Sequence, residues 1–310
     1  MTVYLTGASG FIGSRLLAML QTQGRDVVTL ARQRRNTVLT PQEIHLDESG
    51  TAELGGGGRR VLVHCAGRAH VMQESAADPV EAFRQANVEL TVRLARMAAE
   101  AGLNRFVYLS SIKVNGEATA PGCAFTAFDE PNPLDAYGQS KWEAEQALRK
   151  LAASTGMEVV IIRPVLVYGP DAKGNIRSMV EWIERGLPLP LASVENQRSL
   201  LGLDNLVDLI ITCLDHTAAA NNTFLAADGE DLSTPELVRR IAKTIDREAR
   251  LFPVPAAWME FAASLVGKKA QVQRLCGSLR VDISHTCQTL GWRPPVSLDD
   301  GLRLMTRRGP

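Results

Sequence analysis

Two residues that can handle a proton, Tyr137 and Lys141, are four positions apart in the stretch Tyr-Gly-Gln-Ser-Lys. On a helix, this spacing places both side chains on one face, about one turn apart. An ammonium group beside a phenol favours the phenolate, so we expect Lys141 to lower the pKa of Tyr137 from its unperturbed value of about 10. A tyrosine tuned in this way can exchange a proton with a substrate hydroxyl or carbonyl at neutral pH.

A glycine-rich loop near the start of the chain indicates what accompanies that proton. Residues 2–6 are predicted to form a strand, and Gly7, Gly10 and Gly13 follow it, before a helical pattern that continues to Gly24. Such glycines let the backbone turn tightly and approach a pyrophosphate at the positive end of a helix. Because the loop lies between a strand and a helix, it predicts a dinucleotide site. Together, the loop and the Tyr/Lys pair suggest proton transfer coupled to hydride transfer.

The end of the next predicted strand, at residues 26–30, bears on which dinucleotide binds. A site for NAD usually has an acidic residue there, which hydrogen-bonds the adenosine ribose hydroxyls. This chain instead has the run Ala-Arg-Gln-Arg-Arg at 31–35. A guanidinium can grip a 2′-phosphate through paired hydrogen bonds, so we expect NADP(H), with Arg32 as a contact and NAD(H) as the alternative. Arg34 and Arg35 can instead form a solvated basic turn.

The predicted elements alternate between strands and helices. Further strands are expected at 43–46, 61–65, 105–110, 158–163, 198–203 and 222–226, and helices at 79–101, 137–155, 176–185, 204–216 and from 234. This alternation is typical of a parallel sheet covered by helices on both faces. We therefore predict an α/β fold: a Rossmann-type, doubly wound parallel sheet with a smaller C-terminal substrate-binding cap. We assign residues 1–169 to the dinucleotide-binding domain, which later strands can join, and residues 170–310 mainly to the cap.

Composition argues against several classes of function. The chain has 310 residues, 45% of them hydrophobic, with 34 Lys+Arg balanced by 34 Asp+Glu. The zero net charge gives no reason to expect nucleic-acid binding. We find no signal peptide and no stretch of about 20 apolar residues, so we expect a cytoplasmic protein without membrane insertion. The five cysteines form no Cys-x-x-Cys pattern, so we expect no metal site and reduced thiols.

Five stretches resemble the extended short-chain dehydrogenase/reductases, in the branch of nucleotide-sugar epimerases, dehydratases and reductases. They occur in the family's order, at 6–13, 64–67, 109–116, 137–141 and 163–170. The resemblance implies an α/β enzyme with a nucleotide-sugar substrate. It also implies a homodimer formed through the helix that carries Tyr137 and the helix before it.

The same resemblance implies a role for individual residues. Ser111 matches the serine or threonine that hydrogen-bonds the reacting oxygen, Tyr137 matches the acid/base, and Lys141 matches the lysine that lowers the tyrosine pKa and holds the nicotinamide ribose. The expected cofactor contacts are Gly7, Gly10, Phe11, Ile12, Gly13, Arg32, Ala66, Gly67, Tyr137, Lys141, Arg163 and Pro164.

Two departures from the family pattern narrow the reaction. Dehydratases of the family carry an acid pair directly after the catalytic hydroxyl residue, where this chain has Ile112 and Lys113. Neither side chain can fill the paired-acid role, so we expect redox chemistry without dehydration. The family's usual Val-Tyr-Gly reads Val-Asn-Gly here, so Asn115 is expected to alter the substrate pocket.

The substrate side of the site is predicted from fewer residues. Arg198 matches the arginine that contacts the diphosphate of a nucleotide sugar, and a buried phosphate needs such a donor. Asn175 is predicted to donate to the diphosphate or the sugar, Arg274 to lie near the nucleotide, and Ser111 to contact the substrate. A surface salt bridge for Arg198 and a turn role for Asn175 are the alternatives.

The type of reaction depends on whether the cofactor is regenerated. An epimerase returns its hydride to the same sugar, whereas a reductase consumes NAD(P)H, commonly NADPH. The arginines at 31–35, and a resemblance of 111–118 and 204–210 to bacterial surface-polysaccharide enzymes, favour NADPH-dependent reduction of a UDP-4-keto-6-deoxy-N-acetylhexosamine. The alternatives are a UDP-hexose 4-epimerase with tightly bound NAD and a non-catalytic, nucleotide-sensing family member.

Overall fold

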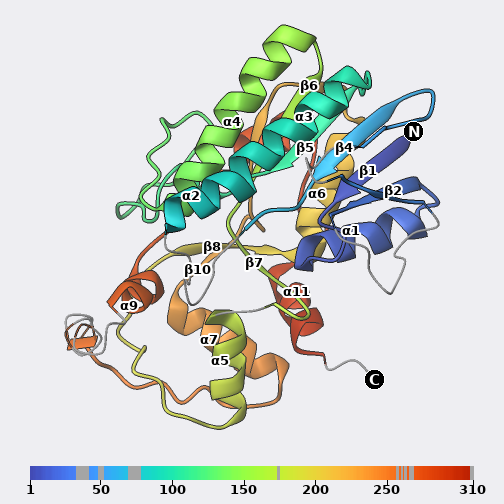
Figure 1. Ribbon diagram of the computed structural model, residues 1–310. Coiled ribbons are helices and arrows are strands. Elements are labelled where there is room, and N and C mark those ends of the chain that lie inside the picture. Colours follow the sequence, from blue (N-terminus) through green and yellow to red (C-terminus); the bar gives the residue numbers. More distant parts are fainter. Residues whose placement is uncertain are drawn as a thin grey trace.

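A seven-stranded parallel sheet forms the centre of the molecule (Figure 1). The computed structural model describes residues 1–32, 42–47, 52–68, 78–172, 175–255, 258–259, 261, 264 and 269–307. The strand order is β3-β2-β1-β4-β5-β6-β9. The bounds are β1 Thr2–Thr6, β2 Asp26–Ala31, β3 Glu43–His45, β4 Arg60–His64, β5 Arg105–Leu109, β6 Glu158–Pro164 and β9 Thr223–Ala226.

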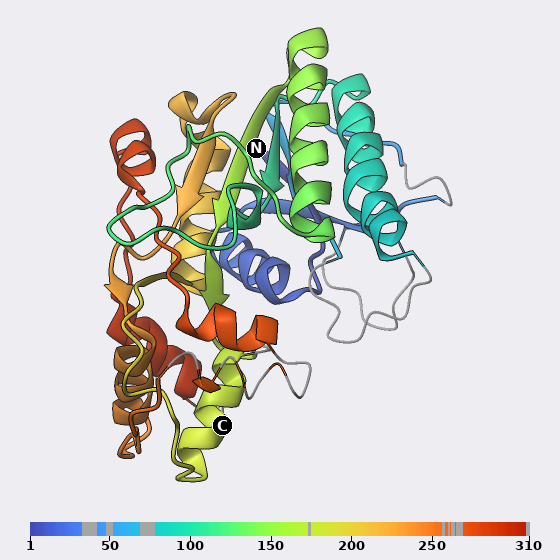
Figure 2. The same cartoon turned by 90° about the vertical axis from the view of Figure 1, so that its left-hand side faces the viewer.

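Helices cover both faces of this sheet, as the two views in Figures 1 and 2 show. One apolar core packs the sheet against α1 (Phe11–Thr22) and α6 (Leu203–Asp215). A second core packs the opposite face against α3 (Leu90–Glu100) and α4 (Ala136–Thr155). With a core on each face, β5 is buried along its whole length, which explains its apolar sequence. The predicted α/β, doubly wound fold is confirmed.

The strand order places the ligand site of such a sheet. Chain order reverses between β1 and β4, which pair in parallel in the middle of the sheet. In open α/β sheets, ligands bind at such a switch point, outside the carboxyl ends of the strands. The loops that follow β1, β4 and β5 therefore meet at one edge, where the predicted cofactor and catalytic residues follow their strands.

A smaller layer lies beyond the carboxyl end of β6 (Figure 1). Its three-stranded sheet has the order β10-β8-β7, from Asp231–Leu232, Arg198–Gly202 and Leu166–Tyr168. A third apolar core joins this sheet to three helices: α5 (Asn175–Glu184), α7 (Thr234–Thr244) and α11 (Leu298–Thr306). Further helices in the described part of the chain include α9 (Lys269–Cys276), α10 (Ser284–Leu290) and the short η3 (Thr217–Ala219).

The predicted elements lie within a residue or two of those observed, with one informative exception. The helix expected at 79–101 consists of α2 (Pro79–Arg84), a π-helical segment η1 (Gln85–Glu89) and α3. The division of the chain at residue 169 stays a prediction, and both β9 and α6, which lie beyond it, belong to the large sheet and its packing. Among the described residues, no helix has the length and apolarity that a membrane crossing requires.

Candidate active site

The glycines of the loop after β1 allow the protein backbone to come close to a ligand. Gly7 has φ of 73°, and a Cβ atom there would stand 2.6 Å from the Ala66 amide nitrogen. A Cβ atom on Gly13 would stand 2.1 Å from the Gly7 carbonyl oxygen. The N-cap of α1 is Gly10, which has no side chain to cap the helix, and this leaves the first-turn N–H groups for an anionic partner. The loop therefore fits the pyrophosphate of a dinucleotide.

Ser111 and Tyr137 are brought together from two different elements. Ser111 follows β5 and is the N-cap of the short 3₁₀ helix η2 (Ile112–Val114). Tyr137 lies in the first turn of α4, whose N-cap Asp135 accepts a hydrogen bond from the Gly138 amide at 2.7 Å. The side chain of Ser111 lies close enough to Tyr137 to lower its pKa. One substrate oxygen can therefore contact both hydroxyls.

The electrostatic setting of Tyr137 differs from the one that the sequence predicts. Burial raises the pKa of Tyr137 to about 12, the side chain of Ser111 acts in the opposite direction, and Asp135 adds to the rise. The expected lowering of this pKa by Lys141 is wrong, because burial dominates and the Lys141 Nζ lies 5.9 Å from the ring centroid. Burial therefore favours the phenol form of Tyr137, which is the form that donates a proton.

Lys141 points inward, beneath the loops that follow β4 and β5. Its side chain is 4% exposed, and its Nζ donates a hydrogen bond to the Leu109 carbonyl oxygen at 2.9 Å. The same Nζ lies beside Gly67 and 4.7 Å from the Tyr108 ring centroid. Burial lowers the pKa of Lys141 to about 8. A buried ammonium is thus available at the switch point.

Asn87 is a site residue that the sequence did not reveal. It lies in η1, is 1% exposed, and both accepts from the Arg68 amide (2.8 Å) and donates to the Arg68 carbonyl (3.0 Å). Its amide also donates to the Ser140 hydroxyl at 3.0 Å. Asn87 therefore fixes the loop after β4 to α4, next to Lys141. A signal was available, because an asparagine stands at a core-facing position of a predicted amphipathic helix.

His64 belongs to the same buried polar layer. Its Nδ1 lies 2.6 Å from the Thr6 hydroxyl, and its Nε2 lies 3.0 Å from the Thr91 hydroxyl. Burial lowers the pKa of His64 to about 3, with Lys141 and Arg32 adding to the effect. The ring is therefore neutral, and it joins the end of β1 to α3.

The other predicted cofactor residues are found in different settings. Phe11 and Ile12 open α1, Pro164 ends β6, and Arg32 is exposed directly after β2. The Arg163 side chain is buried and directed to Glu145 and Asn115, so its contact with the cofactor stays a prediction. Arg34 and Arg35 lie outside the described residues.

The predicted substrate residues lie in the smaller layer. Arg198 begins β8, and its Nη1 donates to the Gly277 carbonyl at 3.0 Å. Asn175 begins α5 and Arg274 lies in α9, but both side chains lie outside the described part of the chain. The substrate contacts of these three residues stay predictions. In the described residues, no cluster of three potential metal ligands occurs.

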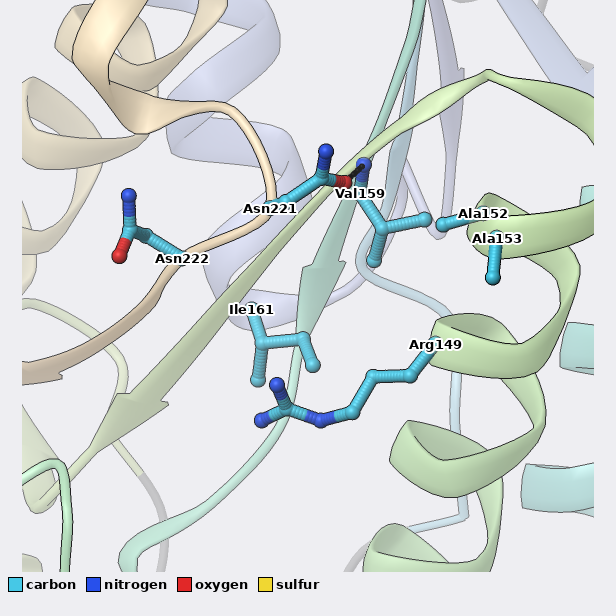
Figure 3. Close-up of a pocket in the computed structure, with 7 residues that line it drawn as sticks. All are labelled: Arg149, Ala152, Ala153, Val159, Ile161, Asn221 and Asn222. Atoms are coloured by element: carbon cyan, nitrogen blue, oxygen red, sulfur yellow. Dashed lines mark hydrogen bonds between the residues drawn. The ribbon is translucent and has the colours of Figure 1, made fainter.

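A cavity of about 270 Å³ lies away from these groups (Figure 3). It is bounded by the C-terminal half of α4, the start of β6 and the turn before β9, with Arg149, Ala152, Ala153, Val159, Ile161, Asn221 and Asn222 lining it. The Asn221 side chain accepts from the Val159 amide at 3.0 Å, at the amino end of β6. The catalytic residues lie at the carboxyl ends of the strands, so this cavity is not the reaction site.

Comparison with known proteins identifies the family. A model of the NAD dependent epimerase/dehydratase family matches residues 3–227. The chain belongs to this family. A curated family relative, a UDP-glucose 4-epimerase of Vibrio cholerae, is 44% identical over 97% of this chain and 93% of its own length. A GDP-6-deoxy-D-mannose reductase of Pseudomonas aeruginosa is 24% identical over 97% of this chain and 94% of its own length.

Solved structures agree with the family assignment at the level of the fold. A UDP-glucuronic acid 4-epimerase of Bacillus cereus in complex with NAD has a TM-score of 0.75 and 19% identity, over 98% of this chain and 97% of the other. A UDP-glucose 4-epimerase of Thermotoga maritima with UDP-glucose has a TM-score of 0.75 and 20% identity, over 98% of this chain and 97% of the other. The family and its relatives make this chain an NAD(P)-dependent nucleotide-sugar epimerase or reductase.

Proposed function

We propose that this chain carries out oxidation and reduction at C4 of a UDP-linked hexose, and that it acts as a 4-epimerase. The observation that carries the proposal is the placement of Ser111 and Tyr137 within interacting distance of each other, beside the buried Lys141, at the switch point of the sheet. The 44% identical relative named UDP-glucose 4-epimerase supports the choice of reaction.

The proton chemistry follows from the three side chains. When the sugar C4–OH is oxidised, the phenolate form of Tyr137 takes the hydroxyl proton and becomes the phenol, and when the C4 ketone is reduced, that phenol returns the proton to the new alkoxide. Ser111 donates a hydrogen bond to the reacting oxygen in both directions. The Lys141 ammonium would stabilise the phenolate, which is the form of Tyr137 before the oxidation and again after the reduction. Because the same tyrosine gives back what it takes, the protein ends the cycle unchanged.

The residues present fit a dinucleotide. The glycine cradle, the uncapped start of α1 and the loop at Ala66 and Gly67 would hold NAD(P), with its pyrophosphate at the helix N-terminus. A bound nicotinamide supplies the hydride acceptor and donor. The NAD complexes among the structural neighbours support NAD, and the exposed Arg32 after β2 supports NADP(H).

A 4-ketoreductase is the second candidate, and two observations favour it. Arg32 stands where an NAD site usually carries an acid, and NADPH is the usual donor in reductive biosynthesis. Burial favours the protonated form of Tyr137, and a reduction begins from that form. In this version, hydride from NADPH reduces the ketone of a UDP-4-keto-6-deoxy-N-acetylhexosamine, and Tyr137 supplies the proton.

Substrate turnover with and without coenzyme separates the two candidates. The purified chain is incubated with UDP-glucose, UDP-galactose, their N-acetylated forms and a UDP-4-keto sugar, each without coenzyme, with NAD⁺, with NADH and with NADPH. Interconversion of the hexoses without net coenzyme consumption supports the epimerase. Oxidation of NADPH in proportion to the loss of the 4-keto sugar, without hexose interconversion, supports the reductase. Absence of both reactions refutes the proposal.

The role of Tyr137 is tested with Tyr137→Phe, which removes only the phenolic hydroxyl. We expect kcat to fall about 10²–10⁴-fold while nucleotide binding is retained. Tyr4→Phe is the matched control, because the Tyr4 hydroxyl donates to the Gly55 carbonyl, in the connection that precedes β4. Unchanged turnover in Tyr137→Phe contradicts the assignment.

The homodimer through α3 and α4 remains a proposal, for which sedimentation equilibrium is the direct test.

A further inference from the structure

A fully buried ion pair lies behind the catalytic residues. Glu145 and Arg163 are 0% and 2% exposed, on α4 and β6 respectively. The guanidinium grips the carboxylate with two hydrogen bonds, Nε to Oε1 at 2.9 Å and Nη2 to Oε2 at 2.6 Å. A buried pair of this kind is a poor source of stability, because desolvation offsets the attraction. Its further contacts therefore point to another role.

The remaining hydrogen bonds of the pair reach both ends of one short helix. The Ser110 hydroxyl donates to Glu145 Oε1, and Arg163 Nη1 donates to Asn115 Oδ1 at 2.9 Å. Ser110 directly precedes Ser111, and Asn115 is the residue at which η2 ends. Ser111, the N-cap of η2, thus lies between two residues, Ser110 and Asn115, that are each hydrogen-bonded to the same ion pair.

Asn115 extends this network towards the smaller layer. Its amide donates to the Thr126 carbonyl at 3.0 Å. The neighbouring Phe125 pairs with the chain at 280–282, through hydrogen bonds from Phe125 to Arg280 and from Asp282 to Phe125, both 2.8 Å. Asn115 stands where the family pattern has tyrosine. Its short amide side chain contacts both Arg163 and the Thr126 carbonyl.

We propose that the Glu145–Arg163 pair is a positioning device for the reaction: it fixes both ends of η2 and so holds the Ser111 hydroxyl against Tyr137. Glu145, Arg163, Ser110 and Asn115 act through Ser111 and are positioning residues. The inference rests on the catalytic roles proposed above for Ser111, Tyr137 and Lys141.

The charge of Glu145 gives the device a second effect. Glu145 lies one helical turn after Lys141, and its carboxylate favours the ammonium, against the burial that lowers the Lys141 pKa. The charged and titratable groups around Lys141 come from β4, β5, β6 and α4: His64, Cys65, Tyr108, Arg163, Tyr137 and Glu145. Of these, Glu145 is the carboxylate, so its neutralisation should make Lys141 lose its proton at lower pH.

The anchors are tested with Ser110→Ala and Asn115→Ala. Each removes one bond to the pair, so we expect kcat per folded site to fall about tenfold or more, with KM within about twofold, because small displacements of a positioned group are costly. Asn132→Ala is the matched control, since Asn132 is exposed and lies in the same segment between η2 and α4 as Asn115. A purely structural role would lower the thermal midpoint and leave kcat per folded site unchanged. That result would overturn the inference.

The charge is tested with Glu145→Gln, and Glu143→Gln on the same helix is its control. We expect the alkaline limb of the pH–kcat profile to move down by about one pH unit or more in Glu145→Gln only. If this variant does not fold, Ser110→Ala and Asn115→Ala decide the inference alone. If the wild-type chain turns over no sugar, the proposed function fails. An active wild type with unaffected variants refutes only the positioning role.

Discussion

Replacing Lys141 by methionine should remove catalysis without weakening the fold at neutral pH. Burial lowers the pKa of Lys141 from 10.5 to about 8, with Cys65 and Glu145 opposing the change. The unfolded chain keeps the ordinary pKa, so the folded chain holds this proton less tightly. At about 1.4 kcal/mol per pH unit, the folded state is penalised by roughly 3 kcal/mol below about pH 8. The penalty shrinks as the pH rises and is gone above the unfolded pKa.

The substitution also removes a favourable contact. Methionine has a similar length, but it cannot donate to the Leu109 carbonyl, which the Lys141 Nζ reaches at 2.9 Å. An unpaired buried carbonyl costs about 1–3 kcal/mol. We therefore expect Lys141→Met to change the free energy of unfolding by about 0 to +2 kcal/mol at neutral pH. At about pH 9.5 the penalty on the wild-type folded state is smaller. The free energy of unfolding of the variant, relative to the wild type, should therefore be about 2 kcal/mol lower than at neutral pH.

Urea unfolding at these two pH values measures the effect. Lys150→Met is the control, because Lys150 is exposed on the same helix. For this control we expect a small change in the free energy of unfolding that is the same at both pH values. The reasoning is refuted if Lys141→Met destabilises the chain at neutral pH by more than about 2 kcal/mol and by the same amount at high pH.

Three further outcomes follow from the site. Gly13→Ala places a Cβ atom 2.1 Å from the Gly7 carbonyl oxygen, so NAD(P) affinity measured by calorimetry should fall about tenfold or more. Gly57→Ala, with open space around it, should leave this affinity unchanged. Because the pKa of His64 is lowered to about 3, stability should fall by up to about 1.4 kcal/mol per pH unit below pH 6.5, a slope that His64→Gln should flatten in urea titrations. Arg32→Ala should weaken NADPH and spare NADH in fluorescence titrations, and equal effects on both coenzymes would exclude a 2′-phosphate contact.

The parts of the fold that the sequence predicted well depend on short-range patterns. The glycine loop, the helix start that follows it and the strand–helix alternation are each encoded within about 30 residues, as a βαβ unit requires. The helix at 79–101 was the exception. Its π-helical turn places Asn87 against Arg68 and Ser140, and apolar periodicity alone does not report such a turn.

The site was predicted in its residue types and was incomplete in its contacts. Ser111, Tyr137 and Lys141 lie at one edge of the sheet, as their places after β5 and in α4 led us to expect. Glu145 was missed, because its partners Ser110 and Arg163 are 35 and 18 positions away in the chain. The direction of the Tyr137 pKa was wrong, because the spacing of two residues says nothing about how deeply they are buried.

The amino-acid sequence by itself determined the order of the elements, the family and the residue types at the reaction edge, because glycine turns and apolar periodicity act locally. Only the tertiary structure decided that the pKa of Tyr137 is raised, that the pKa of Lys141 is lowered, and that Arg163 faces Glu145 and Asn115. The physical reason is that burial and ion pairing depend on which segments the sheet brings together, and those segments are far apart along the chain.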